Sequence, residues 1–277
     1  MQSPLYVLLG HPVAHSLSPA IHNTALAEIG LAGRYEAWDV SPQEVGSVLR
    51  DWRGSAVAGA NVTVPHKQAV IPFLTELSPA ASQIGAVNTI VVSGDQRIGH
   101  NTDFAGFLQP LTESHEKVLI LGAGGSARAV LYALCQHTDA RHVVVCSRKT
   151  QRSRLLIDSM DSMCVTASVA PWEKRTELAP LADLVVNTTP VGMAPHADSS
   201  PLEAVNWRAE QTVYDLIYTP RPTRLLTQAA SCGATIIDGL AMLIGQADAA
   251  FRLWTGHAMP LPAVRHAVEA ALSPSTK

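Results

Sequence analysis

Val118-Leu119-Ile120-Leu121 leads directly into Gly122-Ala123-Gly124-Gly125-Ser126-Ala127-Arg128, and a helix-like run follows. A continuous apolar run of this kind predicts a strand that is buried on both faces of a parallel sheet. Gly122 permits a tight turn, Gly124 lets the backbone approach a pyrophosphate, and the helix N-terminus supplies amide donors to it. Ala127 replaces the usual third glycine and still allows close packing of helix and strand. The stretch therefore predicts a dinucleotide site, with a ligand-free glycine turn as the alternative.

Apolar runs alternate with helix-like stretches along the rest of the chain, which is typical of an α/β protein with mostly parallel strands. The chain is expected to form two domains, residues 1–103 plus 239–277 and residues 104–238. The second has a Rossmann-like pattern, and its sheet is complete by Asp238, so the closing helices are expected to return to the first domain. The predicted strands are Leu5–Leu9, Tyr35–Asp39, Ala58–Val64, Thr89–Val92, Val118–Leu121, His142–Cys146, Leu184–Asn187, Thr212–Asp215 and Thr235–Asp238.

A basic loop follows the second strand of the dinucleotide unit, and it reads Ser147-Arg148-Lys149-Thr150-Gln151-Arg152. An Asp or Glu at this point would accept hydrogen bonds from an unphosphorylated ribose. Three cations and two hydroxyls without an acid instead suit a 2′-phosphate through charge-assisted hydrogen bonds. The loop therefore predicts NADP in preference to NAD, and a solvated basic loop is the alternative.

A second informative stretch is Asn61-Val62-Thr63-Val64-Pro65-His66-Lys67. Because strand side chains alternate, the two valines are expected on one face, and Asn61 and Thr63 on the other. The proline lacks a backbone donor and stops the ladder, which leaves Lys67 just beyond the strand. Two polar groups and a cation in a row suit a hydroxylated, anionic small molecule. An edge strand with a solvated polar face is the alternative.

Further polar side chains lie at predicted junctions between strands and loops. Ser16 and Ser18 come just before a helix start, Asn88 ends a turn, and Asn101-Thr102-Asp103 closes the first domain. Taken singly, each has a local explanation, as a helix N-cap or a turn residue. In the second domain Asn187–Met193 follows a strand, so this loop is expected to border the nicotinamide or its ribose.

Taken in their order along the chain, these motifs resemble those of the shikimate dehydrogenase family. One departure concerns the family's usual Asn-Arg-Thr, where this chain has Ser147-Arg148-Lys149, although Arg148 and Arg152 keep the phosphate-binding cations. The resemblance spans nearly the whole chain, and its segments are His15–Pro19, Asn61–Lys67, Ala86–Thr89, Asn101–Asp103, Gly122–Arg128, Asn187–Met193, Tyr218 with Pro220, and Met242–Gln246.

The resemblance implies a substrate-binding domain (1–103 plus 239–277) and an NADP-binding domain (104–238). It implies the reversible, NADPH-dependent reduction of 3-dehydroshikimate to shikimate in chorismate and aromatic amino-acid biosynthesis, with Lys67 and Asp103 as the catalytic pair. The implied substrate ligands are Ser16, Ser18, Asn61, Thr63, Lys67, Asn88, Asp103, Tyr218 and Gln246. The implied cofactor ligands are Gly122, Ala123, Gly124, Gly125, Ser126, Ala127, Ser147, Arg148, Lys149, Arg152, Thr188, Leu216, Gly239 and Met242.

The chemistry of ketone reduction agrees with this pair. Hydride transfer builds negative charge on the oxygen, which requires a positioned proton donor. Lys67 can donate that proton while Asp103 orients it and bonds the same hydroxyl. The sequence leaves open whether Lys67 transfers the proton or only positions and polarises the substrate.

The composition excludes several other classes of protein. With 277 residues, 47% hydrophobic and 16% charged, the chain can bury a large core. A formal net charge of -3 without a basic run argues against nucleic acid or an anionic membrane as the main partner. No basic residue precedes the short apolar run Leu5–Leu9, so no signal peptide is expected and the chain is placed in the cytoplasm.

The cysteines and histidines give no metal signal. The four cysteines form no CxxC pair and are expected to be free, buried thiols in a reducing cytosol, and the eleven histidines lack ligand spacing. No metal is therefore expected. The apolar faces do not distinguish a monomer from a homodimer.

Two other functions remain as alternatives. A quinate/shikimate dehydrogenase that uses NAD would share these motifs, although the absence of an acid after Cys146 weighs against it. A non-catalytic NADP-sensing module would be expected to lose Lys67 or Asp103, and both are present.

Overall fold

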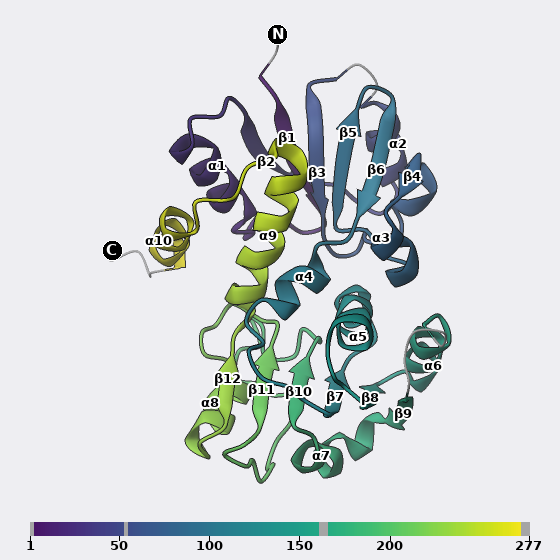
Figure 1. Cartoon of the computed structure of the whole chain (residues 1–277), viewed down its shortest axis with the longest axis vertical. Helices are drawn as coiled ribbons and strands as arrows, with labels where there is room; N and C mark the ends of the chain where they lie inside the picture. Colours follow the sequence, from purple (N-terminus) through teal and green to yellow (C-terminus); the bar gives the residue numbers. More distant parts are fainter. Residues whose placement is uncertain (1–2, 53–54, 161–165, 273–277) are drawn as a thin grey trace. The chain divides into compact units, whose positions relative to one another are not determined.

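The structure is a computed structural model that describes residues 3–52, 55–160 and 166–272. The chain divides into two compact units, Met1–Thr102 with Ile244–Lys277, and Asp103–Leu243. Each unit contains a six-stranded sheet with helices packed on it (Figure 1). The predicted α/β class with mostly parallel strands is confirmed.

The sheet of the first unit has the strand order β2-β1-β3-β5-β6-β4. β1 pairs in parallel with both β2 and β3, whereas β5 is antiparallel to β3 and β6. The strands are β1 (Leu5–Gly10), β2 (Arg34–Asp39), β3 (Val57–Val62), β4 (Glu76–Leu77), β5 (Thr89–Ser93) and β6 (Gln96–His100). The helices that belong to this unit are α1 (Ser18–Glu28), α2 (Val45–Arg50), η1 (Ile71–Phe73), α3 (Pro79–Ile84), most of α9 (Gly239–Thr255), and α10 (Leu261–Leu272).

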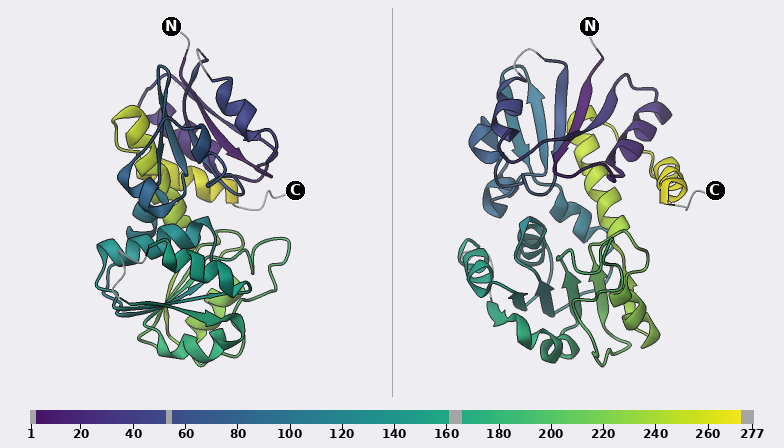
Figure 2. Two further views of the ribbon diagram at one scale, coloured as in Figure 1. Left: turned by 90° about the vertical axis from the view of Figure 1, so that its right-hand side faces the viewer. Right: turned by 180° about the vertical axis from the view of Figure 1, so that it is seen from behind.

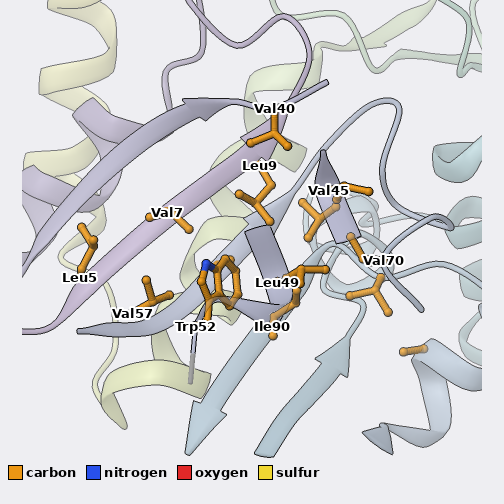
Figure 3. Packing of buried hydrophobic residues seen from close by; sticks show 14 residues of the cluster. Leu5, Val7, Leu9, Val40, Val45, Leu49, Trp52, Val57, Val70 and Ile90 are labelled. Carbon is orange, nitrogen blue, oxygen red and sulfur yellow. The ribbon is translucent and has the colours of Figure 1, made fainter. Parts of the chain in front are cut away.

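One face of this sheet packs in an aliphatic cluster around Leu5, Val7 and Leu9 of β1 (Figure 3). Leu49 of α2 and Trp52 belong to the same cluster, on the same face of the sheet. Burying an aliphatic side chain of this size stabilises the fold by about 1.5–3 kcal/mol. Because β1 is buried along its whole length, it forms the centre of the unit.

The other face of the same sheet packs against aromatic side chains. The Trp254 indole of α9 donates a hydrogen bond to the carbonyl of Ile90 at 2.9 Å and stacks on Tyr6 with ring centroids 5.0 Å apart. Gly59 lies under the indole, where a Cβ atom would overlap the ring. The C-terminal helices are thus part of the first unit's core.

The second unit is a parallel sheet with the order β12-β11-β10-β7-β8-β9. Helices cover both of its faces (Figure 2). Phe107 of α4 stacks on Tyr214 on one face, and Leu225 and Leu226 of α8 pack with Val213 on the other. The strands are β7 (Lys117–Leu121), β8 (His142–Ser147), β9 (Ala167–Pro171), β10 (Leu184–Asn187), β11 (Thr212–Asp215) and β12 (Thr235–Ile237). The helices are α4 (Asp103–Leu108), α5 (Gly125–His137), α6 (Thr150–Asp158), η2 (Trp172–Lys174), α7 (Arg175–Leu178), η3 (Ala179–Leu181) and α8 (Arg224–Ser231).

The strand expected over Ala58–Val64 ends two residues early. β3 stops at Val62, and the amide of His66 donates to the carbonyl of Thr63 at 2.8 Å, so the chain turns before Val64. Val62 is 2% exposed and Val64 is 68% exposed. The expectation that these valines share a face was wrong because the turn interrupts the alternation.

The cysteine expectation was wrong in part. Cys146 is free and buried, as expected, and Cys232 is free but exposed, whereas Cys135 is disulfide-bonded. Cys164 lies outside the described residues. Spacing along the chain did not reveal this bond, because a disulfide requires proximity in the fold and not a CxxC pair. None of the described helices is long and apolar enough to span a bilayer.

Candidate functional site

Ser16 and Ser18 lie together at the start of α1. The Ser16 hydroxyl donates to the Ser18 hydroxyl at 3.2 Å, and the Ser18 amide donates back to the Ser16 oxygen at 3.2 Å. The N-cap position of α1 is Leu17, with no side-chain cap, so the Ser18 hydroxyl does not cap the helix. The local explanation for this serine, a helix cap, therefore does not apply.

The Asn61 amide is held at the end of β3 by hydrogen bonds on both sides. Its Oδ1 accepts a hydrogen bond from the Tyr35 hydroxyl at 2.7 Å. Its Nδ2 donates to the Asn88 carbonyl and to the Thr89 hydroxyl, each at 3.2 Å. Tyr35 also has a side-chain hydrogen bond with Ser18, while burial raises the pKa of the phenol. These contacts fix which way the amide of Asn61 points.

Asn88 links two further segments of the first unit. Its Nδ2 donates to the Thr102 hydroxyl at 2.9 Å and to Oε1 of Gln246 in α9 at 3.3 Å. Its Oδ1 accepts from the Thr102 amide at 2.7 Å. The structure thus joins Ser16, Ser18, Asn61, Asn88 and Gln246, through Tyr35, into one hydrogen-bonded row.

Lys67 and Thr63 lie next to this row. The Lys67 carbonyl accepts a hydrogen bond from the Val87 amide at 2.7 Å, so the backbone of Lys67 is tied to the segment that immediately precedes Asn88. The Thr63 amide donates to the Leu9 carbonyl at 2.9 Å just past the end of β3. Both side chains are partly buried.

Two of the predicted substrate residues belong to the second unit. Asp103 is the first residue of α4 and is 4% exposed. Tyr218 follows β11 and is partly buried, and burial raises the pKa of its phenol.

The glycine loop after β7 has the form that a dinucleotide phosphate requires. Gly122 has a φ of +113°, and a Cβ atom there would overlap the Thr188 hydroxyl, so only glycine fits. Gly124 is the N-cap of α5, and a Cβ atom added to it would meet nothing within 4 Å. Ala127 is completely buried, in agreement with its predicted packing role. The open approach at Gly124 and the amides of a 13-residue helix suit a pyrophosphate.

The basic loop after β8 presents its charges outward. Arg148, Lys149 and Arg152 are exposed, and none of the ion pairs among the described residues includes them. The Ser147 hydroxyl instead shares a 2.7 Å hydrogen bond with Ser153 and donates to the Lys149 carbonyl at 3.0 Å. Ser147 therefore shapes the loop from inside, while the three cations suit a phosphate monoester.

The remaining predicted cofactor residues in the same unit lie after strand ends or in the first turn of α9. The Thr188 hydroxyl donates to the Leu121 carbonyl at 2.7 Å, directly beside the glycine loop. Gly239 starts α9, and a Cβ atom there would overlap the Leu216 carbonyl. Met242 is 7% exposed.

Two residues that the sequence analysis did not select, Tyr35 and Asp215, are central to these networks. Asp215 is fully buried at the end of β11 and accepts a 2.9 Å hydrogen bond from Asn187. Burial raises its pKa to about 6, against the lowering effect of its hydrogen bonds to Thr223, Ile217 and Asn187. An acid as the last residue of the predicted strand Thr212–Asp215 was a signal that could have drawn attention to it.

The residues that the structure describes include no cluster of three or more His, Cys, Asp or Glu side chains able to hold a metal ion.

Known proteins resemble this chain in sequence along most of its length. The substrate-binding domain of shikimate dehydrogenase matches residues 8–90, and the C-terminal domain of shikimate 5'-dehydrogenase matches residues 239–269. A shikimate dehydrogenase (NADP(+)) from Salinibacter ruber is 43% identical over 276 residues, which cover 96% of this chain and 97% of that protein. The chain belongs to the shikimate dehydrogenase family.

Solved structures in this family differ in the dinucleotide that they contain. Shikimate 5-dehydrogenase from Thermus thermophilus, in complex with NADP(H) and shikimate, has a TM-score of 0.87 and 39% identity, covering 97% of this chain and 100% of that one. Quinate dehydrogenase from Corynebacterium glutamicum, in complex with NAD, has a TM-score of 0.90 and 32% identity, covering 97% of this chain and 99% of that one. Membership of the family therefore leaves the dinucleotide to be argued from this chain's own residues.

Proposed function

We propose that this protein catalyses the reversible, NADPH-dependent reduction of 3-dehydroshikimate to shikimate, as an oxidoreductase of chorismate and aromatic amino-acid biosynthesis. The observation that carries the proposal is the hydrogen-bonded row from Ser16 to Gln246. A row of hydroxyl and amide groups next to a lysine suits a small ligand that carries several hydroxyls and a carboxylate. Shikimate has this chemistry.

We further propose that residues 1–103 plus 239–277 bind the substrate and that residues 104–238 bind NADP. The open glycine loop, the N-terminus of α5 and the outward cations of the basic loop support this assignment. When bound, NADPH supplies the hydride. Arg148 and Arg152, with Lys149, would hold the 2′-phosphate, while Ser147 holds the loop in shape. Location in the cytoplasm and a monomeric or homodimeric state are parts of the same proposal.

Within this reaction, the protein has to place a proton on the ketone oxygen as negative charge develops there. We assign that proton to the Lys67 ammonium group and the orientation of the same oxygen to the Asp103 carboxylate. Ser16, Ser18, Asn61, Thr63, Asn88, Tyr218 and Gln246 would bind the other hydroxyls and the carboxylate. Because Asn61 and Asn88 are already oriented by protein contacts, little side-chain entropy is lost when the substrate binds.

A single assay tests the proposal. The purified protein is mixed with shikimate or quinate, each with NADP+ or NAD+, and reduced dinucleotide is followed by absorbance. The expected result is turnover of shikimate with NADP+ at a kcat/KM that exceeds the other combinations by about tenfold or more, the effect of one charge-assisted hydrogen bond. Absence of turnover with all four combinations would overturn the proposal.

The second candidate is a quinate/shikimate dehydrogenase that uses NAD. The structural similarity to a quinate dehydrogenase in complex with NAD supports this second candidate. Quinate oxidation with NAD+ at a kcat/KM equal to or above that for shikimate with NADP+ would establish this candidate in place of the first.

A further inference from the structure

Asp215 and Asn187 form a buried pair at the ends of adjacent strands. They are register partners as the last residues of β11 and β10, and both side chains are fully buried. Asn187 Nδ2 donates to Asp215 Oδ1 at 2.9 Å. In an open parallel sheet this edge, at the carboxyl ends of the strands, is where ligands bind. No ion pair among the described residues includes Asp215, so its buried carboxylate depends on hydrogen bonds, and the Thr223 hydroxyl supplies a further one to Oδ2 at 2.7 Å.

The carboxylate determines which way the Asn187 amide points. An ionised carboxylate can only accept hydrogen bonds, so the NH2 group of Asn187 must face it and the amide oxygen must face away. That oxygen then accepts from the Thr189 amide at 3.0 Å and from the Thr189 hydroxyl at 2.7 Å. The same NH2 group also donates to the Val191 carbonyl at 3.3 Å. The loop after β10, which contains Thr188, is therefore folded around an amide whose orientation Asp215 sets.

Asp215 holds the loop after β11 through the same oxygen atom. Its Oδ1 accepts from the Ile217 amide at 3.1 Å, and the carbonyl of Ile217 in turn accepts from the Gly239 amide at 3.1 Å. Leu216 lies between Asp215 and Ile217, against Gly239. Its amide donates to the Asn187 carbonyl at 3.1 Å. Thr188, Leu216 and Gly239, which the family resemblance assigns to the cofactor, thus lie directly beside residues that the Asp215 carboxylate and the Asn187 amide hold in place.

We propose that Asp215 is a positioning residue for the dinucleotide, which aligns the loops after β10 and β11 and the start of α9 through Asn187 and Ile217. This inference rests on the proposed function, because it takes Thr188, Leu216 and Gly239 as cofactor contacts. Asp215 is fully buried, so its proposed role is to act through these residues and not by contact with the dinucleotide. Its loss is therefore expected to weaken dinucleotide binding more than substrate binding.

The test compares Asp215→Ala and Asp215→Asn with a matched control, Gln211→Leu. Gln211 immediately precedes β11, at the opposite end of that strand from Asp215, and is also fully buried. It donates to the Ala179 and Ala182 carbonyls at 2.8 and 2.6 Å and accepts from the Arg208 amide at 2.8 Å. Its replacement removes buried hydrogen bonds in the same unit without touching the loops.

Four quantities are measured for each variant: the dissociation constant of NADPH by fluorescence titration without substrate, the KM for NADP+, the KM for shikimate, and the melting temperature. Asp215→Ala is expected to raise the dissociation constant and the KM of NADP+ by about ten- to a hundredfold, the effect of losing hydrogen bonds to a charged group. The KM of shikimate should change by less than about twofold. Asp215→Asn keeps one acceptor oxygen and should recover part of the loss. Gln211→Leu should lower the melting temperature without changing the NADPH dissociation constant.

The inference is overturned if folded Asp215→Ala binds NADPH like the wild type, or if Gln211→Leu weakens NADPH binding as much. If Asp215→Ala fails to give a cooperative melt, Asn187→Ala replaces it, with the same expected selective loss of NADPH affinity. An unchanged NADPH affinity in that variant overturns the inference as well.

A wild-type protein that neither binds NADPH nor oxidises shikimate would refute the proposed function itself. A normal wild type beside an unaffected Asp215→Ala would refute only the role of Asp215.

Discussion

The Tyr35 hydroxyl donates a 2.7 Å hydrogen bond to Oδ1 of Asn61 across the strand that separates them in the sheet. Tyr35 is 3% exposed and stacks on the ring of His22, with centroids 4.4 Å apart and an interplanar angle of 9°. Burial lowers the pKa of His22 to about 3, so this ring stays neutral at physiological pH and acts as an aromatic support. Tyr35 therefore orients, from inside the core, the side chain of Asn61, which is one of the residues proposed to bind the substrate.

Replacing Tyr35 with Phe is expected to raise the KM for shikimate about three- to tenfold and to lower the free energy of unfolding by about 1–3 kcal/mol. The physical reason is that Oδ1 of Asn61 loses its donor while the ring packing stays. Steady-state kinetics and urea denaturation measure the two effects. Tyr6→Phe is the matched control, because Tyr6 stacks on Trp254 in the same unit and its hydroxyl has no hydrogen bond to the described residues. Equal KM changes in both variants would contradict this role.

Lys67→Ala is expected to lower kcat by about a thousandfold, because the ketone oxygen loses its proton donor. Binding of shikimate, measured by calorimetry, should change far less, since the hydroxyl and amide ligands remain. Gln68→Ala, an exposed neighbour, serves as the control and should keep wild-type kcat. Near-normal turnover in the Lys67 variant would remove this residue from the proposed mechanism.

Arg148→Ala is expected to raise the KM for NADP+ about ten- to a hundredfold and to leave the KM for NAD+ unchanged. The substitution removes a charge-assisted contact that only the 2′-phosphate can make. Kinetics with both dinucleotides at several salt concentrations measure the effect, and the wild-type KM for NADP+ should rise with salt. Arg154→Ala, an exposed cation on α6, is the control. A parallel loss with NAD+ would mean that Arg148 acts on the shape of the loop.

Asp215 is expected to make folding stability depend on pH. Burial raises its pKa from 3.8 in the unfolded chain to about 6 in the folded protein. Its contribution to the free energy of unfolding is therefore fully present below the unfolded-state pKa and is lost as the pH rises through the folded-state pKa. A shift of this size corresponds to about 3 kcal/mol. Asp215→Asn cannot ionise at this position, so its free energy of unfolding relative to the wild type should rise by roughly this amount between pH 4 and pH 7. Urea denaturation across this range measures it, and parallel pH profiles for the two proteins would contradict the expectation.

Much of the fold follows from patterns that are local in the sequence. The apolar run before Gly122 predicted a central strand because burial on both faces requires apolar residues at every position. β6 and β9 were not predicted, because Gln96–His100 and Ala167–Pro171 are mostly polar or small and lack an apolar alternation. Gly94 was the remaining sequence signal for the hairpin between β5 and β6. In the structure this turn glycine has a φ of +58°.

The residues proposed for the site came from motifs at strand ends, and their roles stay predictions. Tyr35 and Asp215 were not selected because their importance depends on neighbours that only the sheet order supplies. Asn61 is 26 positions from Tyr35 in the sequence, and Asn187 is 28 positions from Asp215. A tyrosine in a strand or an acid after one has many ordinary explanations until the partner strand is known.

The division of the chain has a consequence for biosynthesis on the ribosome. The second unit is contiguous, Asp103–Leu243, whereas the first needs both Met1–Thr102 and Ile244–Lys277. Trp254, which covers Gly59 and bonds the carbonyl of Ile90, is translated after the entire second unit. Because domains generally fold as units during synthesis, the second unit can fold while the chain is still growing. The first sheet must wait, with one face uncovered, until the last helices emerge. Substitutions that slow folding of the middle of the chain should therefore prolong the period in which the N-terminal sheet is open to aggregation.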